Sequence, residues 1–147
     1  MASERYTIAI VGAGPGGLSA AARAAETGAS HILLEAAPQL ANTIYRYQKG
    51  KHVMAEPGQL PLRAAIGFEA GTRERILKTW QQGLEKSVAN VRYRAEVVAI
   101  EGEQGKFRLK LADGSEVRAE HVVLGIGLQG NLRRMEVPGD TLPDVQY

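Results

Sequence analysis

Two short apolar runs enclose a segment of small residues near the start of the chain. Residues 6–12 read YTIAIVG and residues 30–35 read SHILLE. Continuous apolar runs of this length predict buried strands of a parallel sheet. Between them, alanine and leucine recur at helical spacing from Pro15 to about Thr27, and Gly28 is a natural helix end. The chain is therefore predicted to begin with a strand–helix–strand unit.

The hydrophobic pattern lapses over residues 36–71, a stretch interrupted by prolines and glycines. A loop this long in a compact domain is unusual and is most often functional. We expect a cofactor-side loop with short helical pieces, and a plain insertion is the alternative.

A helical period resumes at residues 72–88. Its apolar stripe consists of Ile76, Leu77, Trp80, Leu84 and Val88. Thr72 is placed to cap the N-terminus of this helix. The position of Trp80 in the stripe predicts a core side chain rather than one that stacks on a cofactor.

Strand patterns fill most of the remaining chain. Residues 91–94 form a short run, and residues 96–119 alternate around Asp113-Gly114, a strong hairpin signal. They predict a three-stranded antiparallel meander, followed by another buried parallel strand, HVVLGIG, at residues 121–127. The whole pattern predicts an α/β fold: a Rossmann-like parallel sheet with an inserted three-stranded antiparallel meander.

Composition narrows the function classes. The chain has 147 residues, which suits one domain, and its net charge is only +2 without a clustered basic face, which argues against nucleic-acid binding. It has no cysteine, which excludes a disulfide framework, a thiolate metal site and a redox-active cysteine pair; we expect no metal site. No apolar run approaches the ~20 residues of a membrane span. No segment of signal-peptide type precedes the first strand, so we expect a cytoplasmic protein.

A glycine-rich motif, G-x-G-x-x-G, joins the first strand to the first helix. Gly12 allows the tight turn, Gly14 lets a pyrophosphate approach the backbone, and Gly17 lets helix and strand pack closely. The intervening Pro15 and Gly16 complete the loop. A diphosphate would then lie at the helix N-terminus, where N–H groups favour an anion.

Glu35 ends the second strand, 21 positions after Gly14. This is the place of the acidic residue that accepts hydrogen bonds from an adenosine ribose, with Ala36 beside it. A carboxylate there would repel a 2′-phosphate, which disfavours NADP and leaves FAD and NAD as candidate ligands.

With these residues in place, the chain resembles the N-terminal FAD-binding part of the pyridine nucleotide-disulfide oxidoreductases of thioredoxin reductase type. VGAGPGGLSAA is similar to the family's FAD fingerprint, and the helix–meander–strand order of residues 72–127 is also similar. The resemblance implies a backbone contact of Val97 with the adenine. It also makes VVLGIG, which includes Gly125 and Gly127, the counterpart of the family's second short motif. Gly125-Ile126 stands where that motif usually has Ala-Thr. VPGD at 137–140 resembles the family's Pro-Gly turn.

The resemblance also implies what the chain would do. Residues 1–147 would be an incomplete FAD-binding domain of a flavin-dependent NAD(P)H oxidoreductase, holding the ADP part of FAD for hydride and electron transfer. NAD(P)H would be the donor, bound by a pyridine nucleotide-binding domain missing from this chain. A redox partner protein and a homodimer are further expectations.

Alternatives stay open at this point. One is an NAD-binding dehydrogenase domain, and another is a non-catalytic nucleotide-binding module of a larger electron-transfer protein. The resemblance places part of the 36–71 loop near the flavin ring, and an ordinary surface loop is the other interpretation of its polar side chains: Asn42, Tyr45, Arg46, Tyr47, His52 and Glu56. No catalytic residue is identified.

Overall fold

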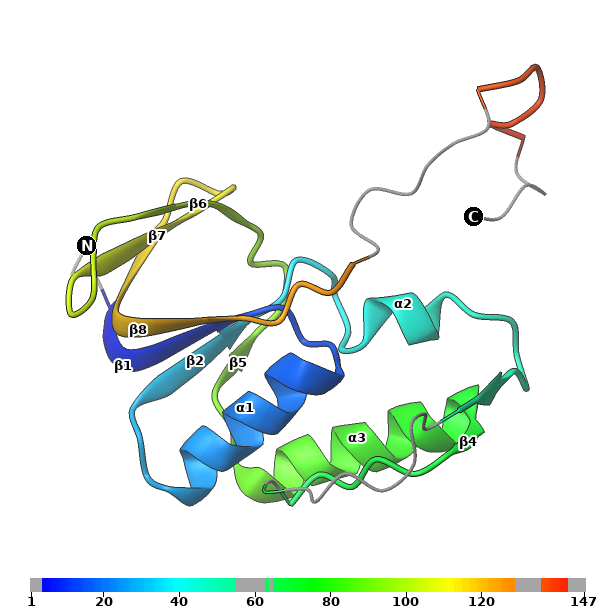
Figure 1. Ribbon diagram of the computed structural model, residues 1–147, viewed down its shortest axis with the longest axis horizontal. Coiled ribbons are helices and arrows are strands. Elements are labelled where there is room, and N and C mark those ends of the chain that lie inside the picture. Colours follow the sequence, from blue (N-terminus) through cyan, green and yellow to red (C-terminus); the bar gives the residue numbers. More distant parts are fainter. Residues whose placement is uncertain (1–3, 55–62, 64, 129–135, 143–147) are drawn as a thin grey trace.

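The computed structural model describes residues 4–54, 63, 65–128 and 136–142 (Figure 1). Its main feature is a six-stranded sheet with the order β5-β2-β1-β8-β7-β6. Four strands are parallel: β1 (Glu4–Val11), β2 (His31–Leu34), β5 (Val91–Arg92) and β8 (Glu116–Leu124). The antiparallel strands β7 (Phe107–Leu111) and β6 (Val97–Glu101) complete it. The predicted fold class, a parallel sheet with a meander, is therefore confirmed.

The helices and the meander contribute to two separate cores. Helices α1 (Pro15–Glu26) and α3 (Arg73–Ser87) lie on one face of the parallel strands (Figure 1). Their core includes Ile10, Leu18, Leu33 and Trp80. Trp80 is buried as predicted, and its indole N–H donates to the carbonyl of Gly67 at 3.2 Å. A second core, between parallel strands and meander, consists of Ala9, Ile32, Leu34, Ala95, Leu109, Leu111, Val117 and Ala119.

Strand β8 differs from its prediction in two ways. The third meander strand and the final parallel strand, predicted separately, are one continuous strand. Over residues 117–119 it pairs with both β1 and β7, whereas residues 121–124 pair with β1 alone among the described strands. The predicted burial of residues 121–127 is wrong: Val123 is 38% exposed and Leu124 is 61% exposed. The reason is that no described strand lies along this part of β8.

Helix α3 begins as predicted and ends earlier. The Thr72 side chain accepts from the backbone N–H of Arg75 at 3.4 Å, which caps the N-terminus. The placement of Val88 in the apolar stripe is wrong. Val88 is the C-cap residue with φ 55°, and its side chain is 84% exposed. The left-handed backbone ends the helix and turns this side chain away from the core.

The long segment between β2 and α3 contains little regular structure. It holds a short helix, α2 (Asn42–Tyr45), and a two-stranded antiparallel sheet of β3 (His52–Val53) and β4 (Gly71–Thr72). The Arg73 guanidinium donates to the carbonyl of Tyr45, which connects α2 to α3. Glu56 lies outside the described residues.

Candidate functional site

The loop after β1 is held by close glycine contacts. Gly12 has φ +96°, a conformation that side chains rarely adopt. A Cβ at Gly17 would lie 1.8 Å from the Gly12 carbonyl oxygen, and a Cβ at Gly12 would lie 2.6 Å from the Gly125 carbonyl oxygen. Both motif glycines are therefore required by the fold itself, as the helix begins directly against the end of the strand.

Gly125 belongs to the same contact. Its backbone N–H donates to the carbonyl of Val11 at 2.7 Å, and a Cβ at position 125 would meet the Gly17 nitrogen at 3.0 Å. Only a very small residue fits here without a shift, which gives a packing reason for glycine in place of the usual alanine. Gly127 follows with φ +66°, and a Cβ at that position would have no neighbour within 4 Å.

Gly14 and Gly16 have no such internal reason to be glycine. Gly14 is the N-cap of α1 with φ −77° and ψ −176°, values open to any residue. A Cβ at Gly14 would have its nearest neighbour at 3.9 Å, and one at Gly16 would have none within 4 Å. Pro15 opens the helix, and no acidic residue lies in the first turn. The backbone is thus accessible at a helix N-terminus, an arrangement suited to a bound anion.

Glu35 fastens this loop to the end of β2. Its buried carboxylate accepts from the backbone N–H of Ala13 at 2.6 Å and from that of Ala37 at 2.8 Å. The two acceptors are different oxygens, Oε2 and Oε1. Each carboxylate oxygen can accept a further hydrogen bond, so the group can bind the loop and a ligand hydroxyl together.

The chain that follows β5 returns to the same place. The N–H of Ala95 donates to the Glu35 carbonyl at 2.9 Å, and that of Arg94 donates to the Ala37 carbonyl at 3.2 Å. These bonds bring the start of β6, at Val97, to the neighbourhood of Glu35 and Ala36. The structure thus places the glycine loop, Glu35, Ala36, Val97 and Gly125 along the carboxyl ends of the parallel strands, the usual ligand position in open α/β sheets.

Two residues beside Glu35 were not identified from the sequence. Ala13 is fully buried, and besides its bond to Glu35 its carbonyl accepts from the N–H of Ala41 at 2.8 Å. An alanine that acts through its backbone carries no sequence signal. Tyr93 is the other: burial raises the pKa of its hydroxyl, and the nearby charges of Glu35 and Glu85 raise this pKa further. Tyr93 therefore stays protonated and neutral at neutral pH.

Three of the polar side chains of the loop have separate neighbours. Tyr45 lies beneath the guanidinium of Arg73, 5.1 Å from the ring centroid, and Tyr47 lies beneath the Lys51 ammonium at 4.1 Å. His52 pairs with Thr72 in the small sheet. The bond between Ala41 and Ala13 ties this segment to the glycine loop, and it leads directly into α2.

In the part of the chain that the structure describes, no cluster of three or more His, Cys, Asp or Glu side chains could hold a metal ion. None of the described helices has the length and apolar character needed to cross a membrane.

Comparison with known proteins finds relatives that are similar in sequence or in fold. The chain is 29% identical to a ferredoxin–NADP reductase of Ignicoccus hospitalis, over 94% of this chain and 42% of the relative. The bacillithiol disulfide reductase Bdr of Staphylococcus aureus has the same fold, with a TM-score of 0.77 and 20% identity over 95% of this chain and 44% of the other. Lactococcus lactis thioredoxin reductase gives 0.70, with 22% identity over 91% and 39%.

The chain therefore spans less than half the length of each of these three proteins. A match to a family description covers almost all of it, residues 9–147. Together with the glycine loop and the sheet that positions it, this match shows that the chain belongs to the pyridine nucleotide-disulphide oxidoreductase family.

Proposed function

We propose that this chain is the FAD-binding part of a flavin-dependent NAD(P)H oxidoreductase. The observation that carries the proposal is the contrast within the glycine loop: Gly12 and Gly17 are needed for packing, whereas nothing in the described protein needs glycine at Gly14 or Gly16. A ligand that approaches the backbone closely accounts for those two. FAD, when bound, supplies the ring that accepts hydride and passes on electrons.

Each site residue then has a defined task. The N-terminus of α1, with Gly14, Pro15, Gly16 and Gly17, holds the diphosphate. Glu35 accepts from ribose hydroxyls while it keeps its bonds to the loop, and its charge disfavours a 2′-phosphate. Val97 provides a backbone contact to the adenine from the start of β6. Gly125 and Gly127 follow β8 on the flavin side.

Two measurements identify the ligand. The purified chain is denatured and the released ligand is identified by mass spectrometry, and ligand-free protein is titrated with FAD and with NADH in a thermal-shift assay. We expect FAD to raise the melting temperature more than NADH does. Stabilisation by NADH but not by FAD would instead support an NAD-binding dehydrogenase domain.

A matched pair of variants locates the site. Gly14→Ala adds a methyl group where a diphosphate would pass, and we expect at least about a tenfold loss of FAD affinity, since each 1.4 kcal/mol is tenfold. Gly67→Ala adds the same group where nothing lies within 4 Å and should bind FAD like the wild type. Equal affinities for the two variants would contradict the proposed site. Circular dichroism verifies that both variants are folded.

We further propose that the whole protein contains additional polypeptide, including the pyridine nucleotide-binding domain. This polypeptide packs along the exposed part of β8. The exposed side chains of Val123, Leu124 and Ile126 support this, as does the short coverage of the relatives. Hydrogen exchange at the amides of residues 121–124 that point away from β1 should be faster in the 147-residue chain than in a longer one. Equal exchange rates in both proteins would contradict the proposal. If the 147-residue chain sediments as a dimer, the result would instead favour a second copy of the chain at this edge.

A further inference from the structure

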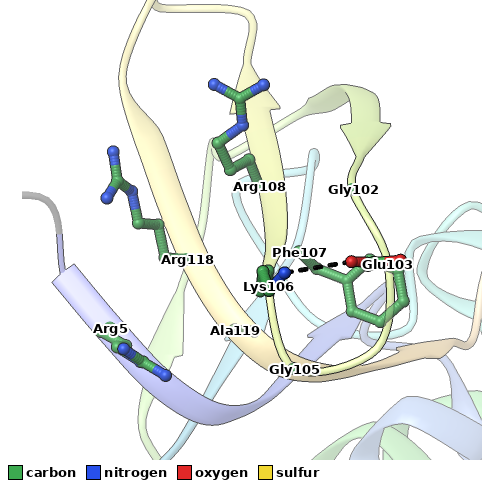
Figure 2. A pocket seen from close by; sticks show the side chains of 9 residues that line it. All are labelled: Arg5, Gly102, Glu103, Gly105, Lys106, Phe107, Arg108, Arg118 and Ala119. Atoms are coloured by element: carbon green, nitrogen blue, oxygen red, sulfur yellow. Dashed lines mark hydrogen bonds and ion pairs between the residues drawn. The ribbon is translucent and has the colours of Figure 1, made fainter.

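A second candidate binding surface lies at the opposite end of β1 from the glycine loop. A hollow of about 820 Å³ is bordered by β1, β8 and the turn between β6 and β7 (Figure 2). Arg5 borders it, seven residues before Gly12, and a strand of that length spans about 23 Å. The hollow is therefore distinct from the site described above.

Three arginines stand in direct cross-strand register beside this hollow. Arg5 on β1 is paired with Arg118 on β8, and Arg118 is paired with Arg108 on β7. Directly paired residues of neighbouring strands have their side chains on the same face of a sheet, so the three arginines share one face; Figure 2 shows them on the neighbouring strands β1, β8 and β7. Neighbouring strands are about 4.8 Å apart, and like charges directly opposite each other destabilise a sheet. The carboxylates paired with these arginines offset part of this repulsion, and a bound anion would offset more of it.

The lining of the hollow has more cations than carboxylates, although each of its cations has a carboxylate within 4 Å. Its lining includes the cations Arg5, Lys106, Arg108 and Arg118 but a single carboxylate, Glu103. The carboxylates that pair with the arginines, Glu120, Glu101 and Glu116, are outside the lining.

These ion pairs leave the arginines able to bind a ligand. Each contact uses one nitrogen of the guanidinium, and the arginine side chains are 67%, 49% and 53% exposed in the order Arg5, Arg108, Arg118. Exposed pairs of this kind are weak, and a guanidinium has five N–H donors. The remaining donors can therefore engage an incoming anion while the carboxylates stay in place.

The shape of the hollow indicates a ligand larger than one ion. Gly102 and Gly105 leave part of the lining without long side chains. The volume is within the range of small-molecule sites, about 300–1,000 Å³. Guanidinium groups match phosphate oxygens in paired hydrogen bonds, and a row of them suits adjacent phosphates.

We propose that this hollow binds a ligand with a chain of linked phosphates, through Arg5, Arg118 and Arg108 with Lys106 at the turn. The phosphate chain is the recognised chemistry, whether it is free or attached to a nucleoside. This site does not depend on the proposed FAD site, and the two fail independently.

Sodium tripolyphosphate is the probe, measured by thermal shift and by calorimetry at low ionic strength. We expect it to raise the melting temperature of the wild type and of Gly14→Ala, whose glycine loop is altered. The double variant Arg108→Gln/Arg118→Gln should bind at least about tenfold more weakly. The matched control, Arg75→Gln/Lys78→Gln on α3, carries the same change of charge and should bind like the wild type.

Two results would overturn the proposal: a shift no larger than sodium sulfate gives at equal ionic strength, or equal binding by the two double variants. Arg118→Lys keeps the charge but loses the planar guanidinium group; it should remain folded and bind more weakly than the wild type.

Binding of ATP to Gly14→Ala distinguishes a free phosphate chain from one attached to a nucleoside. Tighter binding of ATP than of tripolyphosphate assigns a nucleoside polyphosphate, and equal or weaker binding assigns the phosphate chain itself.

Discussion

The backbone N–H of Ala13 donates to Glu35 Oε2 at 2.6 Å, so a residue of the glycine loop is bonded to the last side chain of the β2 segment, 22 positions away. Glu35 Oε1 accepts from Ala37 at 2.8 Å. The carboxylate expected to select the ribose therefore also shapes the loop expected to hold the diphosphate. Binding and local stability should respond together when this side chain is changed.

Glu35→Gln tests this double role. A glutamine amide can accept through one oxygen only, and its NH2 group would face a backbone N–H. We expect the ligand-free chain to lose about 1–3 kcal/mol of unfolding free energy, the cost of an unsatisfied buried donor. Urea unfolding measures it. Glu69→Gln, at a carboxylate 83% exposed, is the control and should change little; equal stability of both variants would show that the bonds to Ala13 and Ala37 contribute nothing.

The neighbouring glycines Gly16 and Gly17 should respond with opposite signs. Gly17→Ala forces a Cβ to within 1.8 Å of the Gly12 carbonyl oxygen and should cost about 3 kcal/mol or more. Gly16→Ala meets nothing within 4 Å, and alanine favours a helix over glycine by about 0.5–1 kcal/mol, so this variant should be slightly more stable. Thermal unfolding without ligand compares them. A Gly17→Ala protein as stable as the wild type would refute the packing argument.

Glu101 gives the protein a defined response to acid. The hydrogen bond and charge of Lys110, followed by the charge of Arg108, hold the pKa of the Glu101 carboxyl below its ordinary value of 4.5. A lowered folded-state pKa stabilises the fold above the unfolded-state value, and the gain is lost as the pH falls through the folded value. Glu101→Gln should therefore be less stable than the wild type at pH 7, and the difference should shrink below pH 4.5.

Salt gives an independent check of the Glu101 prediction. The ion pairs of Glu101 with Lys110 and Arg108 are solvent-exposed, so the difference at pH 7 should also shrink at high ionic strength. A side-chain NMR titration reports the pKa of Glu101 directly. A midpoint at or above 4.5 would contradict the assignment.

Val88 offers a stabilising substitution. It is β-branched, has φ 55° at the end of α3 and is 84% exposed, so its side chain gains little from burial while its backbone is strained. The left-handed conformation costs ordinary residues about 1–2 kcal/mol, and asparagine tolerates it. We expect Val88→Asn to raise the unfolding free energy by about 1 kcal/mol. Ser87→Asn, one residue inside the helix, should give no such gain in the same urea titration.

Periodicity along the chain was sufficient to predict most of the secondary structure. Apolar runs predicted β1 and β2, helical spacing predicted α1 and α3, and the Asp113-Gly114 turn predicted the hairpin of β7 and β8. These features are local, because the residues that determine each one are within a few positions of each other. The 21 positions between Gly14 and Glu35 are the length of one helix and one strand, which predicted that the two residues follow the adjacent strands β1 and β2.

Contacts between distant segments were decided by the tertiary structure alone. Gly125 packs on Gly12 and Gly17, and Ala13 is bonded to Glu35 and Ala41, through backbone atoms that no pattern of side chains reveals. The row of Arg5, Arg118 and Arg108 likewise depends on the register of three strands. The sequence by itself determined the elements and the motif, since these follow from local periods and turns. The tertiary structure decided which backbone groups and charges meet, because register and close packing are set by the whole sheet at once.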